Sequence, residues 1–213
     1  MSNELFITFE GGEGSGKTTQ LNKLAAHLSQ QGHSVVTTRE PGGTDQADAI
    51  RALIVQKASG NWPPFAELCL VSAARMVHVR DVIAPALAEG KTVLCDRFID
   101  STIAYQGYGH GLDLAIINDV TQNAIGDLAP DVTLLFDIPP TQGIARTQRR
   151  SFDGDDVLED KFESLDLSFH ERVREGFLTL AKNNAERFRI IDATQTVDAI
   201  SAHVFQQIES LSQ

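Results

Sequence analysis

The chain has 213 residues, of which 42% are hydrophobic and 22% are charged, and its formal net charge is −11. These proportions and this length suit one compact, water-soluble domain. The negative charge repels polyanions and no long basic stripe is present, so we expect no nucleic-acid partner. No segment is apolar enough to span a bilayer, which predicts no membrane partner. With only two cysteines and no leader-like N-terminus, we predict a cytoplasmic location.

Short β-rich runs alternate with long amphipathic stretches along the whole chain. The predicted strands lie at 5–9, 34–38, 92–95, 132–136 and about 190–191. Helical spacing of apolar residues predicts one helix that ends near residue 32 and others at about 45–55, 65–89, 115–126, 141–150, 161–183 and 197–211. Pro85 is expected to kink or divide the longest of these. Five strands alternating with helices predict an α/β fold, a five-stranded parallel sheet with helices on both faces, in a single domain spanning 1–213.

Residues 11–18 fit the P-loop pattern G-x-x-x-x-G-K-[ST] at every fixed position. The motif follows a predicted strand and opens a predicted helix. Its glycines let backbone N–H groups turn around phosphate oxygens, and the helix N-terminus adds positive partial charge. Lys17 should reach the β- and γ-phosphates of ATP, and Thr18 should offer its hydroxyl to Mg²⁺. The predicted nucleotide-binding residues are Gly11, Gly12, Glu13, Gly14, Ser15, Gly16, Lys17 and Thr18.

A P-loop indicates a nucleotide but leaves the reaction open. The sequence lacks the N-K-x-D and D-x-x-G motifs of a GTPase switch, and it is too short for the coupling domains of a motor or transport ATPase. A small P-loop kinase is therefore the leading class. Two alternatives stay open: a kinase for another nucleoside monophosphate or a deoxynucleoside, and a P-loop binding or switch module without turnover.

A kinase needs an acceptor site, and arginines near strand ends are candidates to bind its phosphate. These candidates are Arg39, Arg51, Arg75 and Arg97. Ligands of open α/β sheets bind at the carboxyl edge, and an arginine directly after a buried strand is costly without an anionic partner. Each one alone is equally consistent with a structural ion pair, but the set favours phosphate binding. Asp96 is a candidate to position Mg²⁺, or else the ion-pair partner of Arg97.

Three arginines share one face of the helix predicted at 141–150. Arg146, Arg149 and Arg150 are spaced i, i+3 and i+4, and a polar, turn-like segment follows at 151–156. A basic face joined to a mobile loop is what a lid closing over ATP requires, so we predict a lid at about 146–160. A solvated, charged helix end would give the same pattern. The acidic run at 153–160 lacks calcium-loop spacing and predicts surface.

Several blocks of the sequence resemble the bacterial thymidylate kinases, in the order and spacing of that family and over essentially the whole chain. They are F-E-G-G-E-G-S-G-K-T-T at 9–19, T-R-E-P-G-G-T at 38–44, A-A-R at 73–75, D-R-F at 96–98 with Ser101, and A-Y-Q-G at 104–107. The second and the last two blocks are far more specific than the P-loop. The resemblance implies a P-loop kinase with a lid that transfers the ATP γ-phosphoryl group to dTMP, and a homodimer. It also implies that Glu40 helps to hold Mg²⁺.

The family motifs imply roles around the phosphate and sugar of dTMP. Arg39 and Arg97 would contact the dTMP phosphate, and Arg51 would lie close to the acceptor site. Glu13 would lie near the 3′-hydroxyl group, and Tyr105 would crowd the 2′ position and so disfavour ribose. The arginines at 146, 149 and 150 resemble the subtype that carries its catalytic arginine in the lid. The implied catalytic set is Lys17, Arg97, Arg149 and Arg150, with Arg146 on the nucleotide and with Thr18, Glu40 and Asp96 at the metal.

The motifs also imply which residues recognise the base. Arg75 would hydrogen-bond the thymine O4 atom, and Thr102 and Gln106 would contact the rest of its polar edge. Many relatives place a phenylalanine four residues before the base-recognising arginine, where its ring stacks on thymine, whereas this chain has Val71. Either Val71 packs flat under the base or another aromatic residue such as Phe65 takes over, and stacking should be weaker.

Overall fold

Five parallel strands form one sheet in the order β2-β3-β1-β4-β5. The computed structural model describes residues 4–55, 62–152 and 165–211. The strands are β1 (Phe6–Glu10), β2 (Val35–Arg39), β3 (Thr92–Asp96), β4 (Val132–Asp137) and β5 (Phe188–Asp192). β1 pairs with both β3 and β4, so the P-loop that follows it leaves from the middle of the carboxyl edge. The predicted parallel sheet is confirmed.

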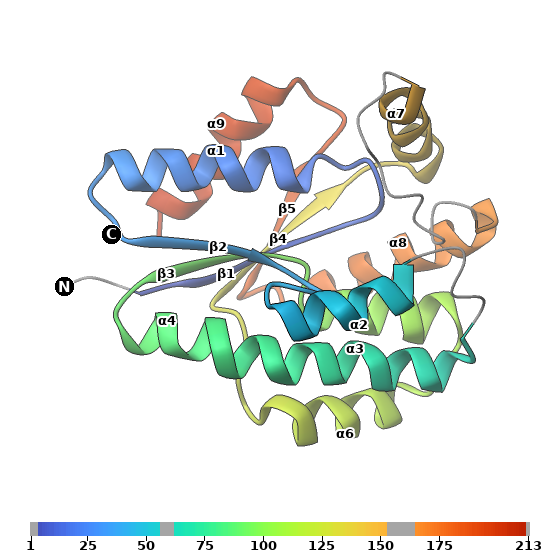
Figure 1. Ribbon diagram of the computed structural model, residues 1–213. Helices are drawn as coiled ribbons and strands as arrows, with labels where there is room; N and C mark the ends of the chain where they lie inside the picture. The colour runs from blue at the N-terminus through green and yellow to red at the C-terminus, as the bar shows by residue number, and fades with distance from the viewer. Residues whose placement is uncertain (1–3, 56–61, 153–164, 212–213) are drawn as a thin grey trace.

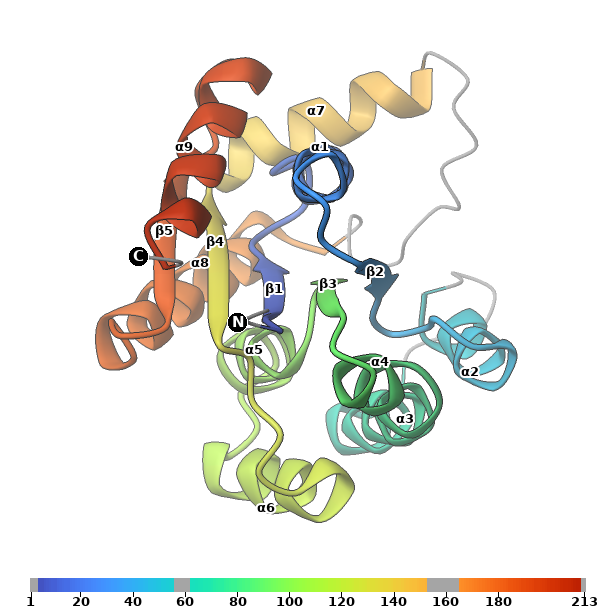
Figure 2. The ribbon, with the colours of Figure 1, turned by 90° about the vertical axis from the view of Figure 1, so that its left-hand side faces the viewer.

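Helices cover both faces of this sheet (Figures 1 and 2). α1 (Lys17–Gln30) and α9 (Val197–Glu209) pack together on one face. The opposite face carries α3 (Pro64–His78), α4 (Ala84–Ala88) and α8 (Leu167–Asn183), and α6 (Leu114–Ile125) packs on the outer side of α3. α2 (Asp45–Val55) packs on α3, and α7 (Pro140–Phe152) follows β4 at the carboxyl edge. In the described ranges no helix has both the length and the apolar character needed to cross a membrane.

Two helical stretches bear on the prediction. The helix predicted after residue 64 and up to about 89 is divided just before Pro85, as expected, into α3, a π-helical turn η2 (Val79–Ile83) and α4. Pro85 lies in the first turn of α4, where its missing N–H is tolerated, and the wider π turn directly before it absorbs the disruption. The segment after β3 is also helical, as α5 (Ile99–Thr102) and η3 (Ile103–Gly109), because packing against its neighbours overrides weak periodicity. The start of the helix predicted at 161–183 lies outside the described residues.

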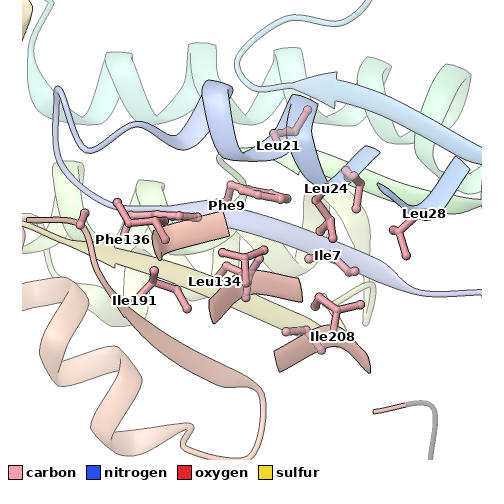
Figure 3. Packing of buried hydrophobic residues seen from close by; sticks show 14 of the residues in the cluster. Ile7, Phe9, Leu21, Leu24, Leu28, Leu134, Phe136, Ile191 and Ile208 are labelled. Atoms are coloured by element: carbon pink, nitrogen blue, oxygen red, sulfur yellow. The ribbon is translucent and has the colours of Figure 1, made fainter. Parts of the chain in front are cut away.

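The main core lies between α1, α9 and the sheet. Leu21, Leu24 and Leu28 of α1 pack over Ile7 and Phe9 of β1, as Figure 3 shows. All five are less than 10% exposed, and each such side chain contributes about 1.5–3 kcal/mol when it is fully buried. This packing anchors α1 on the sheet and thereby sets the position of the P-loop between them.

Candidate active site

The P-loop encloses its own lysine. Gly16 caps α1 with a φ of 87°, and Gly11 passes so close to β4 that a Cβ atom would lie 2.4 Å from the Phe136 carbonyl oxygen. The buried Lys17 Nζ donates to the carbonyl oxygens of Gly11 (3.1 Å) and Gly12 (2.9 Å). Burial, helped by the charge of Arg97, lowers the pKa of Lys17 to about 8. A phosphate would be a stronger acceptor than these carbonyls, so the loop is built to take an anion.

A hydroxyl and a carboxylate meet where the P-loop faces β3. The Thr18 hydroxyl donates to Asp96 Oδ2 at 2.7 Å. Both residues line a cavity of about 730 Å³ that also includes the P-loop from Glu13 onward. Hard oxygen donors beside a phosphate site are what Mg²⁺ prefers, so the residues present fit that ion.

Arg97 connects the P-loop to the segment after β3. Its φ of 69° lies in the left-handed region, and among the described residues other than glycine only Arg97 has a positive φ. This backbone conformation turns the side chain back across the edge of the sheet, at a cost of about 1–2 kcal/mol. Nη1 donates to Gly11 O (3.0 Å) and Ser101 Oγ (3.1 Å), and Nη2 donates to Glu13 Oε1 (2.8 Å). Its ion-pair partner is therefore Glu13, and the alternative of a pair with Asp96 is not adopted.

Glu13 projects from the P-loop to the residues that follow β3. Its Oε1 atom accepts hydrogen bonds from Arg97 and from the Tyr105 hydroxyl, the latter at 2.7 Å. Burial alone would raise the pKa of Glu13, but the positive charges of Arg97 and Lys17 outweigh it and lower the pKa to about 2. Glu13 is thus ionised at neutral pH and lines both the P-loop cavity and the adjoining pocket.

The adjoining pocket, called the acceptor pocket below, brings together most of the predicted substrate residues. Its walls include Glu13, Arg51, Val71, Arg75, Arg97, Thr102, Tyr105 and Gln106. Arg75 is 2% exposed, and its Nη2 atom donates to Thr102 Oγ1 at 2.8 Å. Its Nη1 atom has no hydrogen-bond partner among the described residues, so a donor is left at this wall. Val71 lines the pocket, whereas Phe65 is 51% exposed and does not.

Glu40 lines both cavities and pairs with Arg75. One oxygen of Glu40 accepts from Arg75 Nε at 2.6 Å, and the other lies 3.0 Å from Nδ1 of the buried His78. His78 Nε2 lies in turn 2.6 Å from the Thr38 hydroxyl. Both Glu40 oxygens are therefore engaged, so the direct partners of Glu40 are Arg75 and His78. Its contact with Mg²⁺ stays a prediction.

Two of the predicted phosphate-binding arginines lie in different places. Arg39 is 57% exposed at its side chain, pairs with Asp48 at 3.1 Å, and lines the P-loop cavity but not the acceptor pocket. Arg51 donates to the Pro41 carbonyl oxygen at 2.9 Å and lines both cavities. The structure therefore groups Arg51 and Arg97 where the cavities meet and leaves Arg39 nearer the solvent.

The predicted lid arginines lie on α7. Arg146 is partly buried and donates to the Ala193 carbonyl oxygen at 2.9 Å, at the end of β5. Arg149 is exposed. The side chain of Arg150 and the predicted lid residues 153–160 lie outside what the structure describes.

Sequence reasoning missed two residues that support the site. Glu67 and His78 are buried on α3, on the face that also carries Val71 and Arg75. The four positions follow helical spacing, i, i+4, i+8 and i+11. Charged or polar residues in a buried helical stripe were the available signal, because such groups are buried only when they have partners.

Glu10, at the end of β1, contacts the segment that follows β3. Its carboxylate accepts from Phe98 N at 2.7 Å and from Ser101 Oγ at 2.5 Å. Burial and the nearby Asp100 carboxylate raise the pKa of Glu10 to about 8. The folded protein therefore binds this proton more tightly than the unfolded chain, whose glutamates titrate near pH 4.5. The stability that the folded protein gains from binding this proton is fully present below pH 4.5 and is lost as the pH rises through about 8.

We expect Glu10→Gln, which stays neutral at every pH, to gain stability relative to wild type as the pH rises from 5.5 to 9. The relative gain should be about 3 kcal/mol, or about 6–12 °C in Tm. Thermal unfolding of both proteins at the two pH values measures it, with the exposed Glu89→Gln as control. A Tm difference that does not change with pH would contradict this account of Glu10.

The chain resembles known proteins along almost its whole length. The sequence model of the family described as thymidylate kinase matches residues 9–204. A thymidylate kinase of Geobacter sulfurreducens is 50% identical over 199 residues, 93% of each chain, and one of Desulfosudis oleivorans is 46% identical over 206 residues, 96% of each. A crystal structure of thymidylate kinase from Ehrlichia chaffeensis covers 99% of both chains, with a TM-score of 0.77 and 37% identity. The chain therefore belongs to the thymidylate kinase family.

Proposed function

We propose that the chain transfers the γ-phosphoryl group of ATP to dTMP, giving ADP and dTDP, with ATP in the P-loop cavity and dTMP in the acceptor pocket. The observation that carries this proposal is the contact between Glu13 of the P-loop and Arg97 and Tyr105 of the pocket. One ion pair thus joins the wall of the donor cavity to the wall of the acceptor pocket, so the two substrates would meet across it.

On the donor side, this chain's residues bind and orient the triphosphate. Lys17 would exchange its carbonyl partners for β- and γ-phosphate oxygens, and a nearby anion would raise its pKa and keep it charged. Thr18 and Asp96 are the residues that would hold Mg²⁺, and Glu40 remains a further candidate. When bound, the ion supplies positive charge against the phosphate oxygens.

On the acceptor side, no general base is required. A nucleoside monophosphate has a second phosphate pKa of about 6, so the attacking oxygen is already largely ionised near neutral pH. Transfer then depends on alignment and on neutralising charge, which Arg97 and Arg51 are placed to supply. Arg39 would join them only by leaving Asp48. The Glu13 carboxylate would accept from the sugar 3′-hydroxyl group, and the Tyr105 ring would crowd the 2′ position.

Base recognition would rest on hydrogen bonds more than on stacking. The unpaired Nη1 donor of Arg75 and the polar ends of Thr102 and Gln106 lie in the walls that a base would contact. Val71 lines the same pocket, so its flat side would pack under the base in place of an aromatic ring.

Lid arginines would act mainly on the transferring phosphoryl group. Because that charge develops in the transition state, we expect Arg149→Ala to lower kcat at least tenfold while KM for dTMP changes less than about threefold. Arg150→Ala tests the adjacent position in the same way. Steady-state kinetics with dTMP as the varied substrate separate the two constants. A change in KM alone would mean that these residues only bind substrate.

The acceptor is tested by measuring ADP release with dTMP, dUMP, AMP, GMP, CMP and UMP at equal concentrations. We expect the highest kcat/KM with dTMP. Faster turnover with AMP or GMP would exclude dTMP as the acceptor, and no turnover with any acceptor would favour a binding module.

We also propose a single domain, a cytoplasmic location and a homodimer. The two cysteines are both free thiols, which suits a reducing compartment. α3 and α6 pack side by side and expose apolar residues, among them Phe65, Met76, Leu114 and Ile116, which supports burial of this surface against a second copy. Light scattering of the purified protein measures the oligomeric state directly.

A further inference from the structure

Two side chains in the wall of the acceptor pocket each donate a hydrogen bond to a buried carboxylate. Arg75 Nε donates to Glu40 at 2.6 Å, and Gln106 Nε2 donates to Glu67 Oε1 at 2.8 Å. Glu67 is 2% exposed and does not itself line the pocket. It therefore reaches the pocket through Gln106 and not directly.

The partner of the Gln106 amide decides which end of that amide faces the pocket. An amide group has a donating NH₂ end and an accepting oxygen end, and a half-turn exchanges them. Because Gln106 Nε2 donates to Glu67 Oε1, the NH₂ end points to Glu67 and the oxygen is left for the pocket. His110 Nε2 lies 3.6 Å from the same Glu67 oxygen.

The wall of the acceptor pocket therefore presents one hydrogen-bond donor and one hydrogen-bond acceptor, each at a fixed position. The guanidinium of Arg75 can only donate, and the oriented Gln106 offers an acceptor. A pyrimidine with a 4-oxo group and an N3–H presents the matching acceptor and donor. Cytosine presents the reverse, a 4-amino donor and an N3 acceptor, and would leave polar groups facing like groups in a buried pocket.

We propose that Glu67 is a positioning residue that sets base specificity: by holding the Gln106 amide in one orientation, it adapts the acceptor pocket to thymine and uracil and against cytosine. This role rests on the acceptor pocket proposed above. A merely structural role for Glu67 would affect all acceptors alike, whereas control of the amide affects only the acceptor whose donor and acceptor groups are reversed.

The test is Glu67→Gln, which keeps the length of the side chain. A glutamine at this position can donate or accept, so Gln106 becomes free to present either end. We expect the ratio of kcat/KM for dCMP to that for dTMP to rise about tenfold, as expected for one mismatched hydrogen bond relieved. The ratio for dUMP to dTMP should stay within about twofold of wild type, because uracil has the same polar edge as thymine. The exposed Glu175→Gln on α8 is the matched control.

A second variant separates orientation from folding. Glu67→Asp keeps an acceptor-only head group, so it should retain the wild-type dCMP to dTMP ratio even if its Tm falls. Equal losses for dTMP, dUMP and dCMP in Glu67→Gln, or a relaxed ratio in Glu67→Asp, would overturn the proposal.

The pocket itself is checked by Arg75→Met and Gln106→Leu in the same assay. If both leave kcat/KM for dTMP unchanged, the pocket does not bind the base and the proposed function of this site fails. If both lower it at least tenfold while Glu67→Gln leaves the dCMP to dTMP ratio unchanged, the inference about Glu67 alone fails.

Discussion

Replacing Lys17 with methionine is expected to lower phosphoryl transfer by at least ~10³-fold, because a single fixed cation at the transferring phosphoryl group contributes on this scale. The ammonium lies at the centre of the P-loop, held by the carbonyl oxygens of Gly11 and Gly12. Methionine preserves the length and much of the packing but removes the charge. Coupled measurement of ADP release at saturating dTMP gives the loss in kcat.

The same variant should remain folded. The folded-state pKa of Lys17 is about 8, below its ordinary value of 10.5. A lowered pKa contributes stability that is present above pH 10.5 and lost as the pH falls through about 8, so at pH 7 the buried charge costs stability without nucleotide. Nucleotide-free Lys17→Met should therefore melt no more than a few degrees below wild type. The matched control is Lys23→Met, whose exposed ammonium pairs with Asp198; retained activity in Lys17→Met would remove the P-loop assignment.

Replacing Arg97 with methionine is expected to have the second large effect: it should lower kcat/KM for dTMP about 10³-fold and lower Tm. Its guanidinium joins Gly11, Ser101 and Glu13 at once. Without it the Glu13 carboxylate keeps the Tyr105 hydroxyl but loses the cation paired with it, and breaking a fully buried pair costs about 3–5 kcal/mol, which is the upper limit for this partly buried one. The pKa of Glu13 should rise accordingly, so the acidic limb of the pH–rate profile should move to higher pH.

Arg97→Lys distinguishes charge from geometry. Lysine keeps the positive charge but cannot hold three partners with a planar fork, so it should recover thermal stability more than activity. Arg80→Met serves as control, because the Arg80 side chain on η2 is 65% exposed and pairs with the neighbouring Asp81. Activity within threefold of wild type in Arg97→Met would show that the acceptor phosphate binds elsewhere.

The elements of the fold were predictable because each leaves a local pattern. Strands buried on both faces give continuous apolar runs such as Leu134 to Phe136, and α1 repeats its leucines at helical spacing. The P-loop was likewise visible, since its glycines are needed at fixed positions of the loop. The helical segment at 99–109 was missed because short and π-helical turns carry no clear period.

The partners within the site were not predictable, because they depend on which strand ends become neighbours. Arg75 and Glu40 lie 35 positions apart in the chain, and Arg97 and Glu13 lie 84 apart. The sequence indicated that these arginines need anions, but only the strand order shows which carboxylates reach them. For this reason the sequence did not indicate that the Glu40 oxygens meet Arg75 and His78, while the predicted contact of Glu40 with Mg²⁺ stays a prediction.

The most direct test of the two-cavity account follows the phosphoryl group itself. With [γ-³²P]ATP, Mg²⁺ and dTMP, we predict that label appears in dTDP in a one-to-one ratio with the ADP formed, and that neither product forms at an appreciable rate without dTMP. Label released as inorganic phosphate at the same rate with and without dTMP would contradict the account, because it would mean that the P-loop cavity hydrolyses ATP without an acceptor in the adjoining pocket.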